Sequence, residues 1–259
     1  MPTPEAEREG GLELCGTTAL VTGAGQRIGA ACAAALARAG ARVAVHYHRS
    51  HAAAESLCAT IRQQGGEAEP FCADLTDDQQ AAPLLERVSS RLGQVRVLVN
   101  NASLFHPGRL QDTPLADWHT LLAIHLTAPF LLMRALASGL APGQAGVVIN
   151  MIDQRVTRPR PGHLAYTVAK SGLWTLTRIA AMELAPAIRV NAIAPGPILP
   201  AVEEGLTKEE AAAQFARISA ATPLGRAGSP RDIVDTLLFL VQHPFITGEM
   251  ICVDGGEHL

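Results

Sequence analysis

Tyr166 and Lys170 are the pair of residues in this chain best suited to proton transfer. They lie near the start of a strongly helical segment, and their spacing of four places both side chains on one face of a helix, one turn apart. An ammonium group beside a phenol favours the phenolate, so we expect the pKa of Tyr166 to fall toward working pH. Tyr166 would then serve as proton donor to a substrate that receives hydride. Taken alone, the pair also fits an ordinary surface helix.

The glycine-rich segment Thr22–Gly29 follows an apolar run of strand length and precedes a helical stretch. In that position, main-chain N–H groups and the helix dipole face a pyrophosphate. The segment fits the pattern G-x-G-x-x-G only loosely, because Ile28 stands where the third glycine is expected. We expect Gly23, Arg27 and Ile28 to contact a dinucleotide, with Arg27 adding a fixed positive charge beside its phosphates.

The end of the second predicted strand carries no acidic residue. Sites for NAD usually have one there, which accepts a hydrogen bond from the ribose 2′-hydroxyl. Arg49 instead offers a two-pronged donor suited to a phosphate, and His48 and Ser50 add further donors. We therefore predict that the cofactor is NADPH, bound through its 2′-phosphate. The alternative is a solvated, charged strand end.

Two more strand ends carry residues that suit a cofactor. Asp74 could accept a hydrogen bond from an adenine amino group, while the main-chain N–H of Leu75 meets a ring nitrogen. After the next strand, the small residues Asn101, Ala102 and Ser103 let the main chain approach the cofactor closely. We predict that all five bind the dinucleotide.

Apolar runs of strand length alternate with amphipathic stretches of helix length. The predicted strands are Thr17–Val21, Arg42–Tyr47, Ala68–Cys72, Val95–Asn100, Gly146–Met151, Ile188–Ile193 and Met250–Val253. The predicted helices are Arg27–Arg38, Ser50–Gln64, Asp77–Leu92, Ala116–Ala137, Leu164–Leu184 and Pro230–Val241. This alternation implies parallel strands joined by crossover helices. The sequence predicts a single-domain α/β fold, a Rossmann-like doubly wound parallel sheet of about seven strands with helices on both faces.

We divide the chain into a flexible N-terminal tail, residues 1–12, and one reductase domain that binds NADP(H), residues 13–259. The stretch Pro195–Gly225 breaks the alternation, with prolines, glycines and a short helix candidate at Lys208–Arg217. Long excursions inside a compact domain are often functional. We expect a substrate lid around residues 196–226, rather than an ordinary surface connection.

The composition argues against several classes of partner. The net charge is −3 and no basic block appears, so we expect no nucleic acid. No apolar run is predicted to be long enough to span a bilayer, so we expect no membrane association. The five cysteines are odd in number, and no two lie at metal-site spacing, so we expect no metal and a reducing, cytoplasmic location.

Together these motifs resemble the short-chain dehydrogenase/reductase family. The resemblance covers Thr17 to the C-terminal residues, and its motifs are the Gly23 turn, Asp74-Leu75, Asn100-Asn101-Ala102, Tyr166 with Lys170, Arg189-Val190-Asn191, Pro195-Gly196 and Val253-Asp254-Gly255-Gly256. It implies hydride transfer from a nicotinamide, a Lys170 contact to the nicotinamide ribose, and cofactor contacts at Pro195, Gly196 and Ile198. It also implies an oligomer, and we expect a homotetramer, with a dimer as the alternative.

The sequence departs from the family pattern at two positions. The family's catalytic serine lies 13 residues before the tyrosine, and here that position is Asp153. The family's helix asparagine, which organises a proton relay to the lysine, corresponds to His125. An ionised carboxylate would repel a developing ketone oxyanion, whereas it suits a substrate that presents N–H groups. Asp153 could also be held protonated by burial, or be a harmless substitution in an inactive protein.

The same pattern resembles the pteridine reductase branch, which pairs an aspartate with the tyrosine and lysine. That resemblance implies a pterin stacked between Phe105 and the nicotinamide, with Arg27, Ser103, Asp153 and Tyr166 as its other contacts. We predict NADPH-dependent reduction of a C=N bond in a dihydropteridine, biopterin, monapterin or dihydrofolate, catalysed by Asp153, Tyr166 and Lys170. The alternatives are a reductase of ketones and a non-catalytic NADP(H)-binding sensor.

Overall fold

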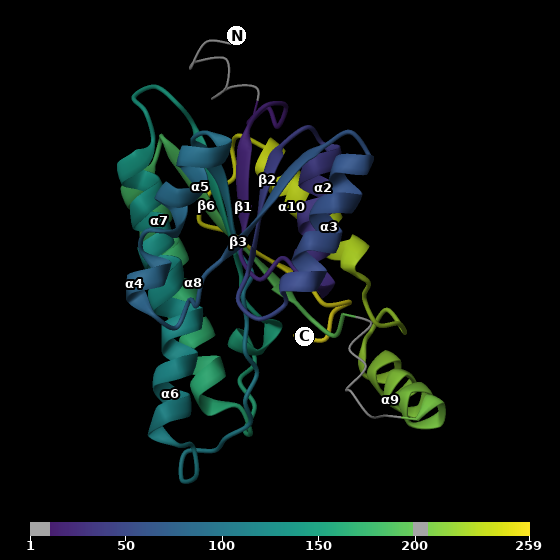
Figure 1. The fold of residues 1–259 in the computed structure, drawn as a ribbon. Coiled ribbons are helices and arrows are strands. Elements are labelled where there is room, and N and C mark those ends of the chain that lie inside the picture. The colour runs from purple at the N-terminus through teal and green to yellow at the C-terminus, as the bar shows by residue number, and fades with distance from the viewer. Residues whose placement is uncertain (1–10, 199–206) are drawn as a thin grey trace.

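The computed structural model describes residues 11–198 and 207–259 and shows one parallel sheet between two layers of helices (Figure 1). Its strands are β1 (Thr18–Val21), β2 (Arg42–Tyr47), β3 (Glu67–Cys72), β4 (Val95–Asn100), β5 (Gly146–Met151), β6 (Ile188–Pro195) and β7 (Met250–Val253). They lie in the order β3-β2-β1-β4-β5-β6-β7, and every pair is parallel. The predicted doubly wound fold with seven strands is therefore confirmed.

Each face of the sheet is covered by its own set of helices, so the core has two halves (Figure 1). One face packs against α2 (Arg27–Arg38), α3 (His51–Gln63) and α10 (Pro230–Gln242). The other packs against α5 (Leu84–Leu92), α7 (Ala128–Gly139) and α8 (Leu164–Leu184). Neighbouring residues of a strand face opposite sides, so Ala19 and Val21 belong to the first half and Leu20 to the second.

Two predicted helices are interrupted. The predicted helix Asp77–Leu92 divides into α4 (Asp78–Ala81) and α5, because Pro83 has no N–H to donate and disfavours helical geometry in the residue before it. The predicted helix Ala116–Ala137 consists of α6 (Leu115–Leu122), a π-helical turn η1 (Ala123–Thr127) and α7. Pro129 follows this turn and cannot make the regular bond to residue 125, which accounts for the wider winding there.

The continuous helical stretch Leu115–Gly139 is long and apolar enough, by length and composition alone, to cross a membrane. The expectation that no such stretch exists is therefore wrong. A core helix of a globular protein passes the same test, and this stretch is partly buried. Leu132 and Leu136 are fully buried in the half of the core that α5 and α8 share, which explains the apolar composition.

The boundaries of the predicted tail and lid are only partly visible. Residues 1–10 of the tail lie outside the described residues, and Leu12, its last residue, is buried in the core. The ordered fold thus begins before residue 13. Residues 199–206 of the predicted lid also lie outside the described residues. Beyond them, α9 (Lys208–Ala221) extends the predicted short helix and begins with a capping box between Thr207 and Glu210.

Leu132→Ala should lower the free energy of unfolding by about 2–5 kcal/mol, because Leu132 is fully buried and its truncation leaves a cavity. Denaturant-induced unfolding measures the change. Leu110→Ala is the matched control: Leu110 is 82% exposed, so its truncation should change stability by less than about 0.5 kcal/mol. Equal effects of the two substitutions would contradict the assignment of Leu132 to the core.

Candidate active site

The predicted site residues gather at the carboxyl edge of the sheet. The strand order reverses between β1 and β4, and in open α/β sheets ligands bind outside the carboxyl ends of the strands at such a point. The Gly23 turn follows β1, residues 101–105 follow β4, and Asp153 follows β5. The first turns of α8 bring Tyr166 and Lys170 to the same edge.

Asp153 and Tyr166 form a direct hydrogen bond. The Tyr166 hydroxyl donates to Oδ2 of Asp153 at 2.9 Å, and Oδ1 of Asp153 accepts from the main-chain N–H of Arg155 at 2.8 Å. Asp153 leaves β5 in an extended conformation and caps a short 3-10 turn, η2 (Gln154–Val156), which fixes the carboxylate at the strand end. Both of its oxygens therefore act as acceptors toward the protein.

The environment of Tyr166 overturns one expectation. Burial raises the pKa of Tyr166 well above its usual value, and the charge and hydrogen bond of Asp153 raise it further. Arg155 and a side-chain hydrogen bond from Ser103 act in the opposite direction but are outweighed. The predicted fall of the Tyr166 pKa is therefore wrong, because a carboxylate contacts the phenol directly. Tyr166 stays a protonated phenol, which suits a proton donor.

Lys170 is 3% exposed, and its ammonium donates to the main-chain oxygen of Met151 at 2.6 Å. Its Nζ lies 5.8 Å from the centroid of the Tyr166 ring. Burial lowers the pKa of Lys170 to about 8, although the charge of Asp153 partly opposes this shift. The ammonium group of Lys170 therefore releases its proton more readily than a solvent-exposed lysine does, and it lies at the end of β5 near the Asp153–Tyr166 pair.

Phe105 forms an aromatic surface next to the Tyr166 ring. Its ring stacks on His163 at a centroid distance of 4.1 Å and meets Tyr166 edge-on at 4.8 Å. The side chain is nevertheless 50% exposed. The loop that carries it is tied to the start of α8, because Leu164 donates its main-chain N–H to the oxygen of Gly108. Phe105 is therefore placed to contact a flat ligand beside Tyr166.

His125 lies in the π-helical turn and is 1% exposed. Its Nε2 is 2.8 Å from the main-chain oxygen of Leu104, and its ring meets Tyr166 edge-on at 5.1 Å. Burial lowers the pKa of His125 well below its usual value, and the charge of Lys170 adds to this effect. A neutral imidazole whose Nε2–H donates to Leu104 thus supports the loop of Phe105. The relay role of this position stays a prediction.

The glycine turn after β1 is locked to the end of β4. The Thr22 hydroxyl accepts from the main-chain N–H groups of Asn101 and Ala102 at 2.8 and 3.0 Å, and the Asn101 amide donates to the oxygen of Thr22 at 2.9 Å. A Cβ at Gly29 would lie 2.3 Å from the oxygen of Gly23, so only glycine fits this packing. Thr22, for which the sequence predicted no role of its own, joins the two predicted cofactor loops.

Arg27 has an unusual main-chain conformation. Its φ of 52° lies in the left-handed region, where a non-glycine residue costs about 1–2 kcal/mol. Its side chain is exposed at the start of α2, and Ile28 follows in the first turn. Strained residues of this kind are concentrated at functional sites. The helix start with this exposed guanidinium fits a phosphate group.

The end of β2 also fits a phosphate. His48 and Arg49 are exposed, and Arg49 makes no ion pair with any residue in the described ranges. Burial raises the pKa of Asp74, but hydrogen bonds from Thr76 and the charges of His48 and Arg49 outweigh burial and lower it. Oδ1 of Asp74 accepts hydrogen bonds from both the N–H and the hydroxyl of Thr76, so this oxygen is already engaged within its own turn.

His46 is a positioning residue that was not among the predicted site residues. Its Nδ1 accepts from the N–H of Gly23 at 3.0 Å, and its Nε2 lies 3.1 Å from the oxygen of Ala73. It therefore links the turns after β1 and β3 from inside β2. Burial lowers the pKa of His46 to about 4, so the ring is neutral.

Residues 23–258 match a family model described as enoyl-(acyl carrier protein) reductase. A 3-oxoacyl-[acyl-carrier-protein] reductase from Synechocystis is 35% identical, and the alignment covers 94% of this chain and 97% of that protein. This chain belongs to the short-chain dehydrogenase/reductase family. It is thus an NAD(P)-dependent oxidoreductase.

Solved structures show close similarity to this chain. FolM alternative dihydrofolate reductase 1 from Brucella canis, complexed with NADP, is 39% identical with a TM-score of 0.87, covering 95% of both chains. The angucycline C-6 ketoreductase LanV with bound NADP is 29% identical with a TM-score of 0.85, covering 95% of this chain and 97% of that chain. The two names give different substrates, so overall similarity does not decide the substrate of this chain.

The structure brings some of the predicted residues into contact and leaves others apart. Asp153, Tyr166, Ser103 and Phe105 form one cluster with Lys170 behind it. The other predicted cofactor residues lie around the strand ends of this short-chain dehydrogenase/reductase fold. Of these, Pro195 ends β6, Gly196 packs on Asp254, and Ile198 is buried and paired with Gly228.

Three residues of the site were missed from the sequence. His46 is a buried histidine in an apolar strand, which is a signal that could have been noticed. His163 and Arg155 meet Phe105 only through the folded chain, the latter with its guanidinium carbon 5.7 Å from the ring centroid. No spacing rule connects these positions to residue 105.

Lowering the pH from 6.5 to about 4 should destabilise the protein through His46. The unfolded chain takes up a proton in this window, whereas the folded state does not, because the pKa of His46 is lowered to about 4. The free energy of unfolding should therefore fall with falling pH, by up to about 3 kcal/mol from this group. In His46→Asn this contribution should vanish, as measured by denaturant unfolding across the window. His243→Asn, at an exposed histidine, should keep the wild-type pH dependence, and an unchanged slope in His46→Asn would refute the assignment.

Proposed function

We propose that this protein reduces a C=N bond of a pterin with hydride from NADPH. The observation that carries the proposal is the Asp153–Tyr166 hydrogen bond at the position where the family pattern has a serine. A carboxylate with both oxygens engaged as acceptors cannot donate to a developing ketone oxyanion. It can accept from the N–H groups that a pterin ring and its amino substituent present.

The ring chemistry of a pterin also suits Phe105. Flat π-systems stack with an offset on an aromatic ring. Half of the Phe105 side chain is exposed to solvent, and His163 stacks on its ring. The Tyr166 ring is in edge contact with this surface, so a ligand stacked on Phe105 would lie close to the phenol. A pterin bound on Phe105 would thus present a ring nitrogen to the phenol.

NADPH, when bound, supplies the hydride. Tyr166, held protonated by its raised pKa, donates its proton to the ring nitrogen next to the carbon that is reduced. Asp153 holds the phenol in position and accepts from the substrate. Lys170, whose pKa is about 8, keeps an exchangeable proton at the end of β5. The exposed donors Arg27 and Arg49 would hold the cofactor phosphates.

Reduction of a 3-oxoacyl thioester or another ketone is the second candidate. It is favoured by the 3-oxoacyl-[acyl-carrier-protein] reductases among the relatives, for example the one from Pseudomonas aeruginosa at 32% identity, covering 96% of this chain and all of that protein. The carboxylate of Asp153 beside Tyr166 argues against ketone reduction, because this carboxylate would repel the oxyanion that develops on a ketone oxygen.

We further propose that the protein works as a homotetramer. Large apolar side chains are exposed on the outer faces of α7 and α8, namely Phe130, Val168, Ile179 and Met182. Burial of such a surface against other copies would be favourable, and larger apolar patches are typical of interaction sites.

The decisive assay offers NADPH with dihydrobiopterin, dihydromonapterin, dihydrofolate and a 3-oxoacyl thioester. Wild type should turn over the pterins in preference to the thioester. Tyr166→Phe should lower kcat about 100-fold or more, because the proton donor is lost. Asp153→Ser should lower pterin kcat/KM roughly 10- to 100-fold, because hydrogen bonds to a charged group are lost, while NADPH binding measured by fluorescence is kept.

Asp235→Ser, at an exposed carboxylate on α10, is the control and should keep wild-type kinetics. Preferential turnover of the thioester by wild type would support the ketone alternative instead. Binding of NADPH without turnover of any of these compounds would indicate a non-catalytic sensor. Full pterin activity in Tyr166→Phe would also overturn the proposed mechanism.

Arg49→Gln should reduce the preference for NADPH over NADH about 10-fold or more, because a charge-assisted contact to the 2′-phosphate is lost. Michaelis constants for the two cofactors measure the effect. Arg38→Gln removes an exposed arginine at the far end of α2 and should leave the preference intact. An unchanged preference in Arg49→Gln would place the 2′-phosphate elsewhere.

A further inference from the structure

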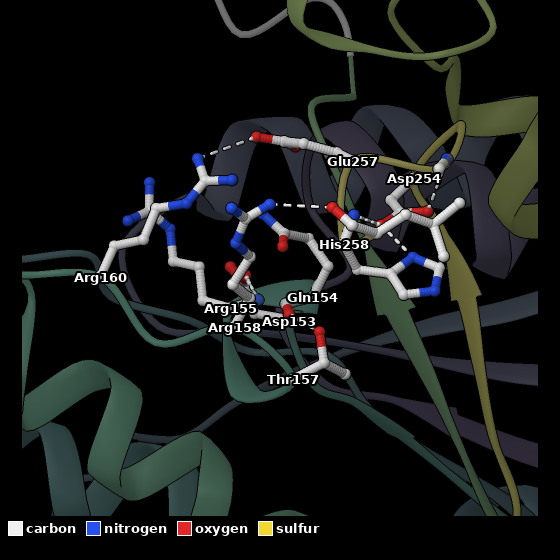
Figure 2. A network of polar contacts seen from close by, with 11 residues as sticks. Asp153, Gln154, Arg155, Thr157, Arg158, Arg160, Asp254, Glu257 and His258 are labelled. Carbon is white, nitrogen blue, oxygen red and sulfur yellow. Dashed lines mark hydrogen bonds and ion pairs between the residues drawn. The ribbon is translucent and has the colours of Figure 1, made fainter.

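Three arginines follow Asp153 within one short loop: Arg155, Arg158 and Arg160. Figure 2 shows their side chains on one side of this loop, with Arg158 and Arg160 reaching toward the segment that carries Glu257. The whole chain has a net charge of −3, so this positive cluster runs against the general charge balance. It also lies directly beside the catalytic carboxylate.

The nearby acceptors neutralise only part of this charge. Arg160 lies 3.4 Å from the Glu257 carboxylate, and Arg158 donates to the main-chain oxygen of Leu259 at 2.8 Å. Asp254 does not contribute, because His258 and two main-chain N–H groups occupy its oxygens. Among residues 11–198 and 207–259, Arg155 has no ion-pair partner for its guanidinium.

Arg155 also lies beside the proposed substrate surface. Its guanidinium carbon lies 5.7 Å from the centroid of the Phe105 ring, and its main-chain N–H binds Asp153. Its positive charge acts on the Tyr166 phenol. A ligand stacked on Phe105 and hydrogen-bonded to Tyr166 would therefore extend its substituents past this unpaired guanidinium.

We propose that Arg155, reinforced by the charges of Arg158 and Arg160, binds an anionic group on the side chain of the substrate. The inference rests on the proposed function and narrows it to pterins with a carboxylate or phosphate in the side chain. The planar guanidinium donates two parallel hydrogen bonds to either anion, which gives both orientation and strength. A neutral polyol side chain would gain much less from the same contact.

The test compares an anionic with a neutral side chain on the same ring. Dihydrofolate carries carboxylates, dihydroneopterin phosphate carries a phosphate, and dihydrobiopterin is neutral. Arg155→Gln should lower kcat/KM for the anionic substrates about 10-fold or more relative to dihydrobiopterin, mainly through KM. Arg155→Lys, which keeps the charge but not the planar group, should restore part of the ratio. Arg231→Gln, on the exposed face of α10, should leave the ratio as in wild type.

Ionic strength provides a test that needs no substitution. Added salt should raise the wild-type KM for the anionic substrates more than that for dihydrobiopterin, because partly exposed charges are screened. This measurement keeps the inference testable even if Arg155→Gln fails to fold. The two anionic substrates distinguish a site for carboxylate from one for phosphate.

Each outcome has a distinct meaning. If Arg155 only supports Phe105, Arg155→Gln lowers kcat/KM by the same factor for all three substrates, and the inference is refuted. An unchanged ratio together with a salt-independent KM refutes it as well. Both results leave the proposed pterin reduction intact. By contrast, the absence of turnover with every pterin in wild type would remove the proposed function and this inference together.

Discussion

The hydrogen bond between a buried phenol and a carboxylate at the end of β5 is the interaction on which the geometry of the candidate active site depends. Because Tyr166 donates to Asp153, its proton is held and its pKa is raised, so the phenol is a donor by default. A serine at residue 153 would share a hydrogen bond without adding negative charge. The carboxylate therefore changes both which proton is available and which substrate atoms are tolerated nearby.

The surrounding scaffold serves to hold this pair beside an open aromatic surface. His125 reaches from the π-helical turn to the main chain next to Phe105 and touches the Tyr166 ring. Thr22 and Asn101 fasten the two loops at the reversal of strand order. Both supports join segments that are distant in sequence, so the site depends on the completed sheet and not on any single loop.

The sequence predicted the sheet well, since each strand is a short apolar run between helical stretches. It predicted the Asp153–Tyr166–Lys170 group from spacing and family resemblance. The pKa of Tyr166 was predicted wrongly because the sequence shows the neighbouring lysine but not the burial or the direction of the ammonium, which turns to Met151. The contacts of His163 and Arg155 with Phe105 arise only from packing between separate loops. The π-helical turn depends on Pro129 within an otherwise regular periodicity, which a pattern of apolar residues does not reveal.

The left-handed conformation of Arg27 has a consequence for engineering. Glycine at this position would relieve the unfavourable φ and would be an obvious choice in a search for thermostable variants. The same exchange would delete a positive charge from the entrance of α2. If Arg27 binds the cofactor phosphates as proposed, stability and cofactor binding are set against each other at this single residue.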